Sequence, residues 1–115
     1  MALIPILQLL EGYLGVAATR HQLIVSNMAN IDTPGYHTQD IDFRSELRKA
    51  TDNNGGELIP AVHSVPGLLQ RPDGNDVNLD REGLLLAETQ MQYQIGVQIM
   101  KSEFHRLLSA INEGK

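Results

Sequence analysis

Apolar residues recur at alternating steps of four and three near the start of the chain. The row consists of Leu3, Leu7, Leu10, Leu14, Ala17, His21, Ile24, Met28 and Ile31, and only His21 is polar. Such spacing places one apolar seam along a helix, as in a coiled coil. It predicts a helix over residues 3–31, with Pro5 in the first turn, where its missing N–H has no helical partner to lose. We expect this helix to be softest near Gly12, because a glycine weakens a helix by about 1 kcal/mol relative to alanine.

The C-terminal stretch repeats the same spacing. Its row consists of Leu86, Gln90, Tyr93, Val97, Met100, Phe104, Leu107 and Ile111, with Gln90 as the polar member. Asn78 or Asp80 is the expected N-cap, and Asp80 and Glu82 stand where the positive end of the helix dipole favours acidic side chains. These signals predict a second helix over residues 80–112, closed by Gly114.

The first helix has an explicit stop signal. Thr33 precedes a proline and is therefore pushed out of the α conformation, while Gly35 is free to adopt a positive φ. Pro34 and Gly35 together predict the two central positions of a type II turn.

The segment between the two rows is dense in Pro, Gly, Asn and Asp, and no period of 3.6 or 2 persists in it. Residues 41–50 fit either a short helix or an extended piece, and residues 58–65 fit a strand. We expect residues 51–77 to form a long, mobile connection with room for one short β-hairpin.

These elements predict an all-α fold. The long N- and C-terminal helices pack as an antiparallel helical hairpin or coiled coil, joined by an irregular central connection. The expected parts are residues 1–36 (N-terminal helix and turn), 37–79 (central connection) and 80–115 (C-terminal helix).

Both helices also carry apolar residues away from the seam. They include Ile4, Ile6, Leu9, Val16, Leu23 and Val25 in the first helix and Leu84, Met91, Ile95 and Ile99 in the second. A helix that is apolar on more than one face needs more than one neighbour. We therefore expect the helices to be marginal in an isolated monomer and to be stabilised when several copies or other partners pack side by side. The competing expectation is a compact monomer in which the central segment covers the second face.

Composition narrows the classes of function. A chain of 115 residues with a net charge of -5 is one acidic domain, which argues against nucleic acid and anionic membranes as partners. The absence of cysteine excludes disulfides, thiolate zinc sites and thiol catalysis. The first basic side chain is Arg20, so the N-terminus lacks the basic region of a cleaved signal peptide, and its apolar run is too short to span a membrane.

No arrangement of side chains predicts catalysis. The four histidines have no ligand spacing among themselves, although His37 with Asp40 and Asp42 is a conceivable metal group. Residues 76–80 match the first oxygen positions of a calcium-binding EF-hand loop, but Arg81 replaces the required glycine. The acidic candidates for acid–base chemistry all have polar or basic neighbours, and we expect none in an apolar setting: Asp40, Asp42, Glu46, Glu82, Glu88 and Glu103. We therefore expect no enzymatic activity, no cofactor and no small-molecule substrate.

One segment carries a specific resemblance. Residues 26–36 read Ser-Asn-Met-Ala-Asn-Ile-Asp-Thr-Pro-Gly-Tyr, which closely resembles the N-terminal signature of the bacterial flagellar axial proteins, the family of rod, hook and hook-associated subunits. Residues 39–43 and 74–82, with Tyr93 and Gln94, look like the rod subunits of that family. The matching parts cover residues 1–43 and 72–115.

The resemblance implies a structural, non-enzymatic role. Family members pack their terminal helices laterally into a helical tube, here the proximal rod of the flagellar basal body, which transmits torque for motility. The implied partners are other copies, other flagellar rod proteins, the MS-ring/rod adaptor proteins and the flagellar export apparatus. The implied location is the periplasm-spanning rod, reached by type III export without a cleaved signal peptide.

The resemblance also assigns roles to residues. The elbow that ends the first helix comprises the motif residues Asn27, Asn30, Asp32, Thr33, Pro34, Gly35 and Tyr36, and the large apolar members of the two rows form the expected assembly seam. The alternative is a soluble helical-hairpin adaptor that binds one amphipathic helix of a partner in a groove.

Overall fold

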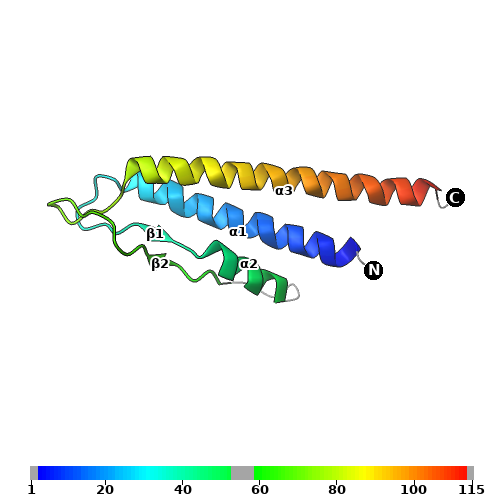
Figure 1. Ribbon diagram of the computed structural model, residues 1–115, viewed down its shortest axis with the longest axis horizontal. Helices are drawn as coiled ribbons and strands as arrows, with labels where there is room; N and C mark the ends of the chain where they lie inside the picture. Colours follow the sequence, from blue (N-terminus) through cyan, green and yellow to red (C-terminus); the bar gives the residue numbers. More distant parts are fainter. Residues whose placement is uncertain (1–2, 53–58, 114–115) are drawn as a thin grey trace.

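An elongated arrangement of helices emerges from the computed structural model, which describes residues 3–52 and 59–113. The molecule measures 69 × 24 × 18 Å with a radius of gyration of 18.0 Å, whereas a compact chain of this length would have a radius of about 13 Å. Its elements in chain order are α1 (Leu3–Ala29), β1 (Gln39–Asp40), α2 (Phe43–Asp52), β2 (His63–Ser64) and α3 (Leu79–Glu113). Helix α1 lies between α3 on one side and the layer of β1, β2 and α2 on the other (Figure 1).

The predicted fold class is confirmed. Helices α1 and α3 run antiparallel along the long axis of the molecule, so the start of α1 and the end of α3 lie at one end and the loops close the other (Figure 1). We call these the open end and the closed end. Because α3 is eight residues longer than α1, its C-terminal part extends beyond α1 at the open end.

Helix α1 ends at Ala29, two residues before the predicted boundary at Ile31. The amide of Asn30 is shared between the carbonyls of Ser26 and Asn27, at 3.1 and 3.2 Å, and the amide of Ile31 bonds the carbonyl of Met28 at 3.3 Å. The bonds thus change from the α-helical spacing of four residues to a spacing of three, which tightens and ends the helix.

The turn predicted at Pro34 and Gly35 is confirmed. Gly35 has φ of 74°, and the amide of Tyr36 donates to the carbonyl of Thr33 at 3.2 Å. A positive φ at the third position and this closing bond are the features of a type II turn.

Asn78 is the N-cap of α3. Its side-chain oxygen accepts from the amide of Arg81 at 3.1 Å, and its carbonyl accepts the first helical bond from Glu82 at 2.9 Å. Asp80 and Glu82 lie in the first turn, as the dipole argument predicts. The predicted closing residue, Gly114, lies outside the described residues.

The central segment is more ordered than we expected. Of the two alternatives for residues 41–50 the helix is correct, and Asp42 caps α2 by accepting from the amide of Ser45 at 3.3 Å. Strand β2 pairs antiparallel with β1, and α2 lies between these two strands in the sequence. The pairing therefore differs from the expected hairpin within residues 51–77. The start of the predicted strand, Leu58, lies outside the described residues.

Helix α1 buries two faces. Leu10, Ala17 and Ile24 are buried, and Tyr13, which also lies beside Gly96 of α3, meets the ring of Phe43 edge to face at 5.6 Å. Gly12 is where α2 approaches most closely, since an added Cβ would lie 2.9 Å from the Cβ of Ala50. The described part of the central segment therefore covers the second face of α1, as the competing expectation stated, and it reaches α3 near the start of that helix, where Asp40 lies 3.6 Å from Arg81.

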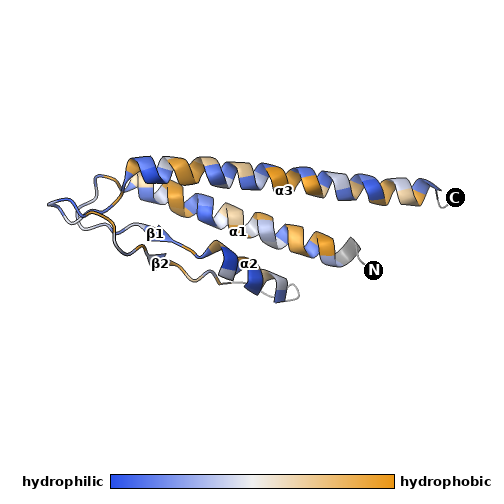
Figure 2. Ribbon diagram, viewed as in Figure 1, coloured by the Kyte–Doolittle hydropathy of each residue, from blue (hydrophilic) through white to orange (hydrophobic). Residues whose placement is uncertain are grey.

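Helix α3 presents a different row to α1 than we predicted. Its buried residues are Glu82, Thr89 and Gly96, spaced seven residues apart, and we call them the inner row. Gly96 permits close approach, because an added Cβ would lie 2.7 Å from a methyl of Leu14 and 3.0 Å from the ring of Tyr13. The expectation that the apolar row of α3 meets α1 is therefore only partly right. Half of this row, namely Leu86, Val97, Met100 and Leu107, is half-buried and the other half is exposed, and apolar residues remain on the outside of α3 (Figure 2).

The close contact at Gly96 gives a stability prediction. Gly96→Val should lower the free energy of unfolding by about 1–3 kcal/mol, because the added methyl groups overpack the site against Leu14 and Tyr13. The matched control is Gly83→Val in the same helix, where an added Cβ meets no atom within 4 Å. Thermal unfolding followed by circular dichroism measures both, and equal melting temperatures for the two variants would show that the contact is not close.

Candidate functional site

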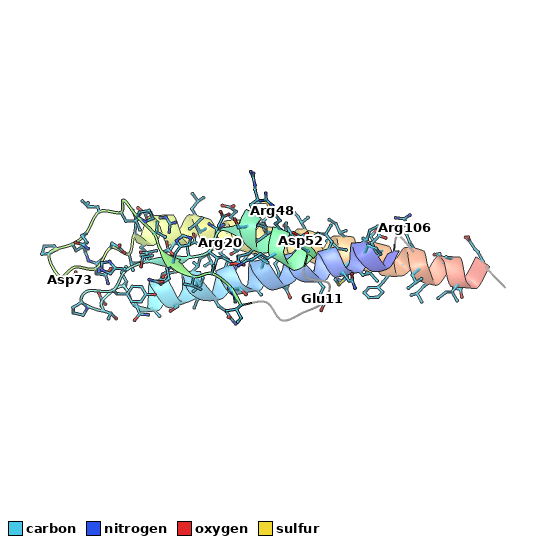
Figure 3. The ribbon with its side chains drawn as sticks, turned by 90° about the horizontal axis from the view of Figure 1, so that it is seen from below. Glu11, Arg20, Arg48, Asp52, Asp73 and Arg106 are labelled. Atoms are coloured by element: carbon cyan, nitrogen blue, oxygen red, sulfur yellow. The ribbon has the colours of Figure 1, made fainter. Side chains whose placement is uncertain are left out.

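Buried polar side chains gather where α1, β1 and α3 meet near the closed end. They come from residues 20–40 and 75–82, which lie within the two parts of the chain that match the family. We call this cluster the polar junction, and it consists of Arg20, Asn27, Tyr36, Thr38, Asp40, Asn75, Asp76, Arg81 and Glu82. Figure 3 shows Arg20 among the packed side chains and Asp73 at the loop beyond them.

Asn27 is the centre of the junction and is 1% exposed. Its amide nitrogen donates to the carbonyl of Gln39 at 2.9 Å and to Oε1 of Glu82 at 2.6 Å. Its oxygen accepts from the hydroxyl of Tyr36 at 2.9 Å and from the amide of Gln39 at 3.0 Å. All four hydrogen-bonding positions of the side-chain amide are therefore filled, and one residue joins α1, the turn, β1 and α3.

The charges of the junction are paired across elements. Arg20 donates to both oxygens of Asp40, at 3.1 and 3.2 Å, in the two-bond geometry that favours guanidinium–carboxylate pairs. Arg81 lies 2.6 Å from the fully buried Glu82 and 3.6 Å from Asp40. Two carboxylates thus share two guanidinium groups, which offsets the cost of burying them.

Three of the acidic candidates are buried, and each of them is surrounded by hydrogen-bonding or charged partners. They are Asp40, Glu46 and Glu82. Their neighbours along the chain are polar, but the elements that pack over them are distant in sequence, so local composition could not reveal the burial.

Asp76 fastens the second matched segment to the first. Its Oδ1 accepts from the amide and the hydroxyl of Thr38, at 2.6 and 2.8 Å, and its Oδ2 lies 3.4 Å from a ring nitrogen of His37. Burial raises the pKa of Asp76, but the Thr38 bonds and His37 outweigh it and hold the pKa below the ordinary value of 3.8. The carboxylate that began the partial calcium motif therefore bonds to protein groups.

Asn75 and Arg71 donate to carbonyl groups of the turn that follows α1. The side chain of Asn75 donates to the carbonyls of Asn30 and Thr33, both at 2.9 Å, and Arg71 donates to the carbonyl of Ile31. Residues 71–77 therefore hold the turn after α1 in place.

The motif residues divide into three groups. Asn27 and Tyr36 enter the polar junction, whereas Asn30 and Thr33 bond each other at 3.0 Å and shape the turn locally. The remaining three are exposed at the turn: Asp32, Pro34 and Gly35. Sequence reasoning missed the partners Asn75, Arg81 and Glu82, although all three lie in the second segment that carries the resemblance.

The expected assembly seam is distributed over several environments. Leu10 and Ile24 are buried, while Tyr93, Phe104 and Ile111 are 45%, 49% and 54% exposed. The half-buried members are Leu7, Leu14, Met28, Ile31, Leu86, Val97, Met100 and Leu107. The side chain of Leu3 lies outside the described part of the structure.

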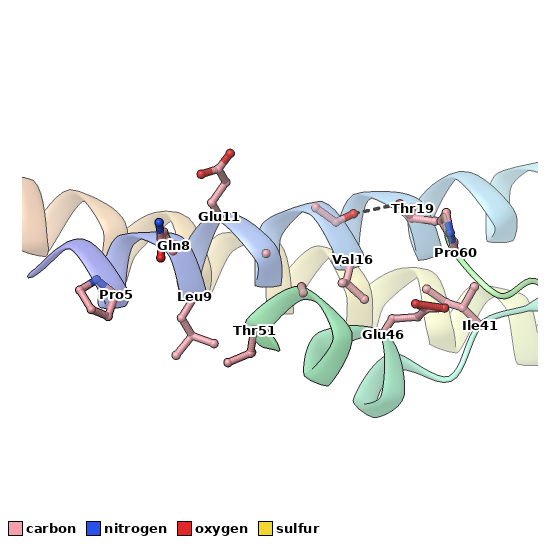
Figure 4. Close-up of a pocket in the computed structure, with 13 residues that line it drawn as sticks. Pro5, Gln8, Leu9, Glu11, Val16, Thr19, Ile41, Glu46, Thr51 and Pro60 are labelled. Carbon is pink, nitrogen blue, oxygen red and sulfur yellow. Dashed lines mark hydrogen bonds between the residues drawn. The ribbon is translucent and has the colours of Figure 1, made fainter. Parts of the chain in front are cut away.

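A groove between α1 and α2 contains one buried carboxylate (Figure 4). This is Glu46, which accepts from the amide of Ala61 at 2.6 Å and pairs with Lys49 at 2.8 Å. Burial raises the pKa of Glu46, but the hydrogen bonds from Lys49 and Ala61 lower it by more than burial raises it. The pKa of Glu46 therefore lies below its usual value. Glu46 thus tethers the returning chain to α2.

The conceivable metal group is dispersed. His37 faces Asp76, Asp40 pairs with Arg20, and Asp42 caps α2. Within residues 3–52 and 59–113, no three His, Asp or Glu side chains are arranged to hold a metal ion. In the same ranges, none of the helices combines the length and the hydropathy that crossing a bilayer requires.

The two long terminal helices are paired, and the 26–36 segment at the end of α1 bonds to α3. These features define the class of protein, which is an axial subunit of the bacterial flagellum. No family model matches the chain. The flagellar basal body rod protein FlgB of Salmonella typhimurium is 31% identical over 122 aligned residues, covering 88% of each chain. The FlgB proteins of Escherichia coli K12 (30% identical, 88% of each chain) and Cereibacter sphaeroides (33%, 81% of this chain and 83% of the relative) are similar. The chain belongs to the FlgB family of flagellar basal body rod proteins.

The central position of Asn27 gives a second prediction. Asn27→Ala should lower the free energy of unfolding by about 2–4 kcal/mol, because it removes the Asn27 bonds from Oε1 of the buried Glu82 and from the amide and carbonyl of Gln39. Asn30→Ala, the control within the same motif, removes turn contacts near the surface and should cost about 1 kcal/mol or less. Urea unfolding measures the difference, and equal losses would contradict the central role of Asn27.

The bonds to Asp76 predict an acid dependence of stability. Because the pKa of Asp76 is lowered on folding, its contribution is complete above the unfolded value and is lost as the pH falls from there through the folded value. Asp76→Asn should therefore reduce stability at pH 7 and flatten its decline below pH 4. Urea midpoints between pH 7 and 3 test this, and parallel curves for the variant and the parent would refute it.

Proposed function

We propose that the chain is a structural, non-enzymatic subunit of the proximal rod, which packs laterally through its terminal helices into a helical tube that transmits torque. The observation that carries this proposal is the long α3, whose apolar residues remain exposed although the hairpin is closed. Monomeric proteins rarely leave extended apolar surface uncovered. The relatives, which are named as rod proteins of the basal body, support the same role.

The proposed partners are other copies of this chain and other flagellar rod proteins, with the MS-ring/rod adaptor proteins and the flagellar export apparatus at the start of assembly. The proposed location is the periplasm-spanning rod, reached by type III export without a cleaved signal peptide. The absence of cysteine suits an oxidising compartment.

The polar junction gives the motif a mechanical role in this proposal. A buried network with filled hydrogen-bonding positions fixes one arrangement of the elements that it joins. It would hold α1 and α3 in register at the closed end while lateral neighbours load the helices. The elbow residues then act by directing the chain from α1 into β1, and the seam residues act by packing on neighbours.

Exposure of Phe104 allows assembly to be separated from folding. Phe104→Asp should leave the helix content of the monomer unchanged, because this side chain is 49% exposed, and should abolish swimming in a strain without its own copy of the gene. A charge placed in a buried interface has a large desolvation cost. His105→Asp, at the adjacent exposed position, is the control and should preserve swimming.

Soft-agar motility and recovery of the chain in purified basal bodies measure the effect. Normal swimming of Phe104→Asp would remove this residue from the assembly seam. A defined one-to-one complex with a single partner, without incorporation into basal bodies, would favour the adaptor.

A further inference from the structure

Strand β2 lies at the outer edge of the structure. Among the described elements it contacts β1 alone, and Figure 1 shows β1 between β2 and α1. Residues 59–64 are all exposed, and residues 59–66 include no Asp, Glu, Lys or Arg. Natural sheet edges are commonly protected from other strands by charged side chains. This edge has no such protection, so its backbone is accessible to a neighbouring chain.

The pairing with β1 fixes which backbone groups of the β2 segment point inward. The amide of Val65 donates to the carbonyl of Thr38 at 2.9 Å, and the antiparallel register pairs His63 with Asp40. In an antiparallel pair, hydrogen-bonded and non-hydrogen-bonded residues alternate along each strand. Val65 and His63 therefore direct their N–H and C=O groups toward β1.

Val62 and Ser64, the residues that alternate with these, direct their backbone groups outward. Within residues 3–52 and 59–113, neither amide donates a hydrogen bond. The carbonyl of Ser64 lies 3.2 Å from a ring nitrogen of the exposed His63. Donors and acceptors that repeat at every second residue are what an added β-strand requires. The outer side of β2 is thus an open hydrogen-bonding edge.

The opposite edge of the same sheet shows how the fold satisfies an outward-facing residue. Gln39 of β1 donates its amide to the side-chain oxygen of Asn27 at 3.0 Å and accepts from the side-chain nitrogen of Asn27 at 2.9 Å. The Asn27 side chain thus takes the place of a peptide group in a third strand. Ser64 is paired with Gln39 across the sheet. It occupies the equivalent position on the outer edge, where no group of the described residues has this role.

We propose that the outer edge of β2 binds an extended segment of a neighbouring subunit by β-strand addition. The inference rests on the proposed function and adds to it a backbone contact made by the central segment. Pro60 and Pro66 bound the edge, because each occupies an outward position and has no N–H to donate. The added strand therefore pairs with Val62 and Ser64, and the two prolines prevent longer, unspecific pairing.

The added strand comes from a protein other than this chain. Each copy offers one open edge, because Asn27 occupies the outer side of β1. Two copies could therefore pair only through the same edge, and such a contact closes at a dimer, which a tube of equally oriented subunits does not accommodate. Ile59 and Val62 are 81% and 47% exposed beside the edge, and no charged residue adjoins them within residues 59–66. An uncharged segment with apolar side chains is the occupant that this edge fits.

The contact consists of a few backbone hydrogen bonds and should be weak between free chains. Within an assembly, other contacts hold the two partners together and raise the effective concentration of the strand. We therefore expect the edge to be open in the isolated chain and occupied in the basal body.

Proline substitution tests the edge, because it removes a single N–H. Val62→Pro should leave the melting temperature unchanged, since the lost amide points outward, and should abolish swimming in a strain without its own copy of the gene. Val62→Ala trims the same side chain, keeps the N–H and should preserve swimming. Ala61→Pro, one residue earlier, removes the inward amide that bonds Glu46 and should lower the melting temperature.

Hydrogen exchange provides a second measurement, which needs no substitution and decides the matter if Val62→Pro lowers the melting temperature. In the isolated chain, the amides of Val62 and Ser64 should exchange faster than those of His63 and Val65. In purified basal bodies that contain the parent chain, exchange at Val62 and Ser64 should slow by about tenfold or more. Quenched samples read at single residues by mass spectrometry measure both states.

Unchanged exchange at Val62 and Ser64 in basal bodies would overturn the inference, as would normal swimming of a folded Val62→Pro variant. Loss of swimming in Val62→Ala would overturn it too, because the side chain would then be responsible. Protection of both amides in concentrated samples of the chain alone would show pairing between copies and refute the assigned partner. A parent chain that restores swimming without the expected protection leaves the rod role intact, whereas one that is absent from basal bodies and restores no swimming removes both.

Discussion

The hydrogen bonds of Asn27 are the constraint on which the rest of the arrangement depends. This one buried amide bonds β1, Tyr36 and Glu82 of α3 at the same time, so the direction of the chain after α1 and the position of α3 are fixed together. An amide has two donors and one acceptor oxygen with two lone pairs, which matches the mixed set of groups that converge here. A carboxylate in its place would put a second negative charge beside Glu82, and an apolar side chain would leave the partners unsatisfied.

Fixing α3 through polar and small residues determines where its apolar residues can go. The inner row is Glu82, Thr89 and Gly96. The contact between α1 and α3 is therefore made mainly by hydrogen bonds near the closed end and by close approach of the two backbones farther along. Because this row contributes little apolar burial to the hairpin, the large side chains of α3 lie on its flanks. The layer of α2 and the sheet covers the second face of α1, and within the described residues no comparable element covers α3.

Sequence patterns predicted the elements better than their contacts. The four-three rows gave both long helices to within two residues, and the residues Thr33, Pro34 and Gly35 gave the turn, because these signals are local. The row of α3 that meets α1 was mispredicted, since periodicity identifies an apolar face but not the neighbour it packs against. The partners of Asn27 could not be predicted for a similar reason, because Glu82 lies 55 residues away in the sequence. A single glutamate at the start of a helix is also explained by its favourable interaction with the helix dipole.

The distribution of polar and apolar burial also bears on how a single sequence can be both ordered and ready to assemble. Buried polar networks are specific because each group needs a partner in one geometry. Apolar surfaces accept many partners, because their burial is favourable in any orientation. Here the specific contacts lie at the closed end, where chain segments distant in sequence must find each other. The permissive surfaces lie along α3, where contact with any similarly apolar helix is favourable.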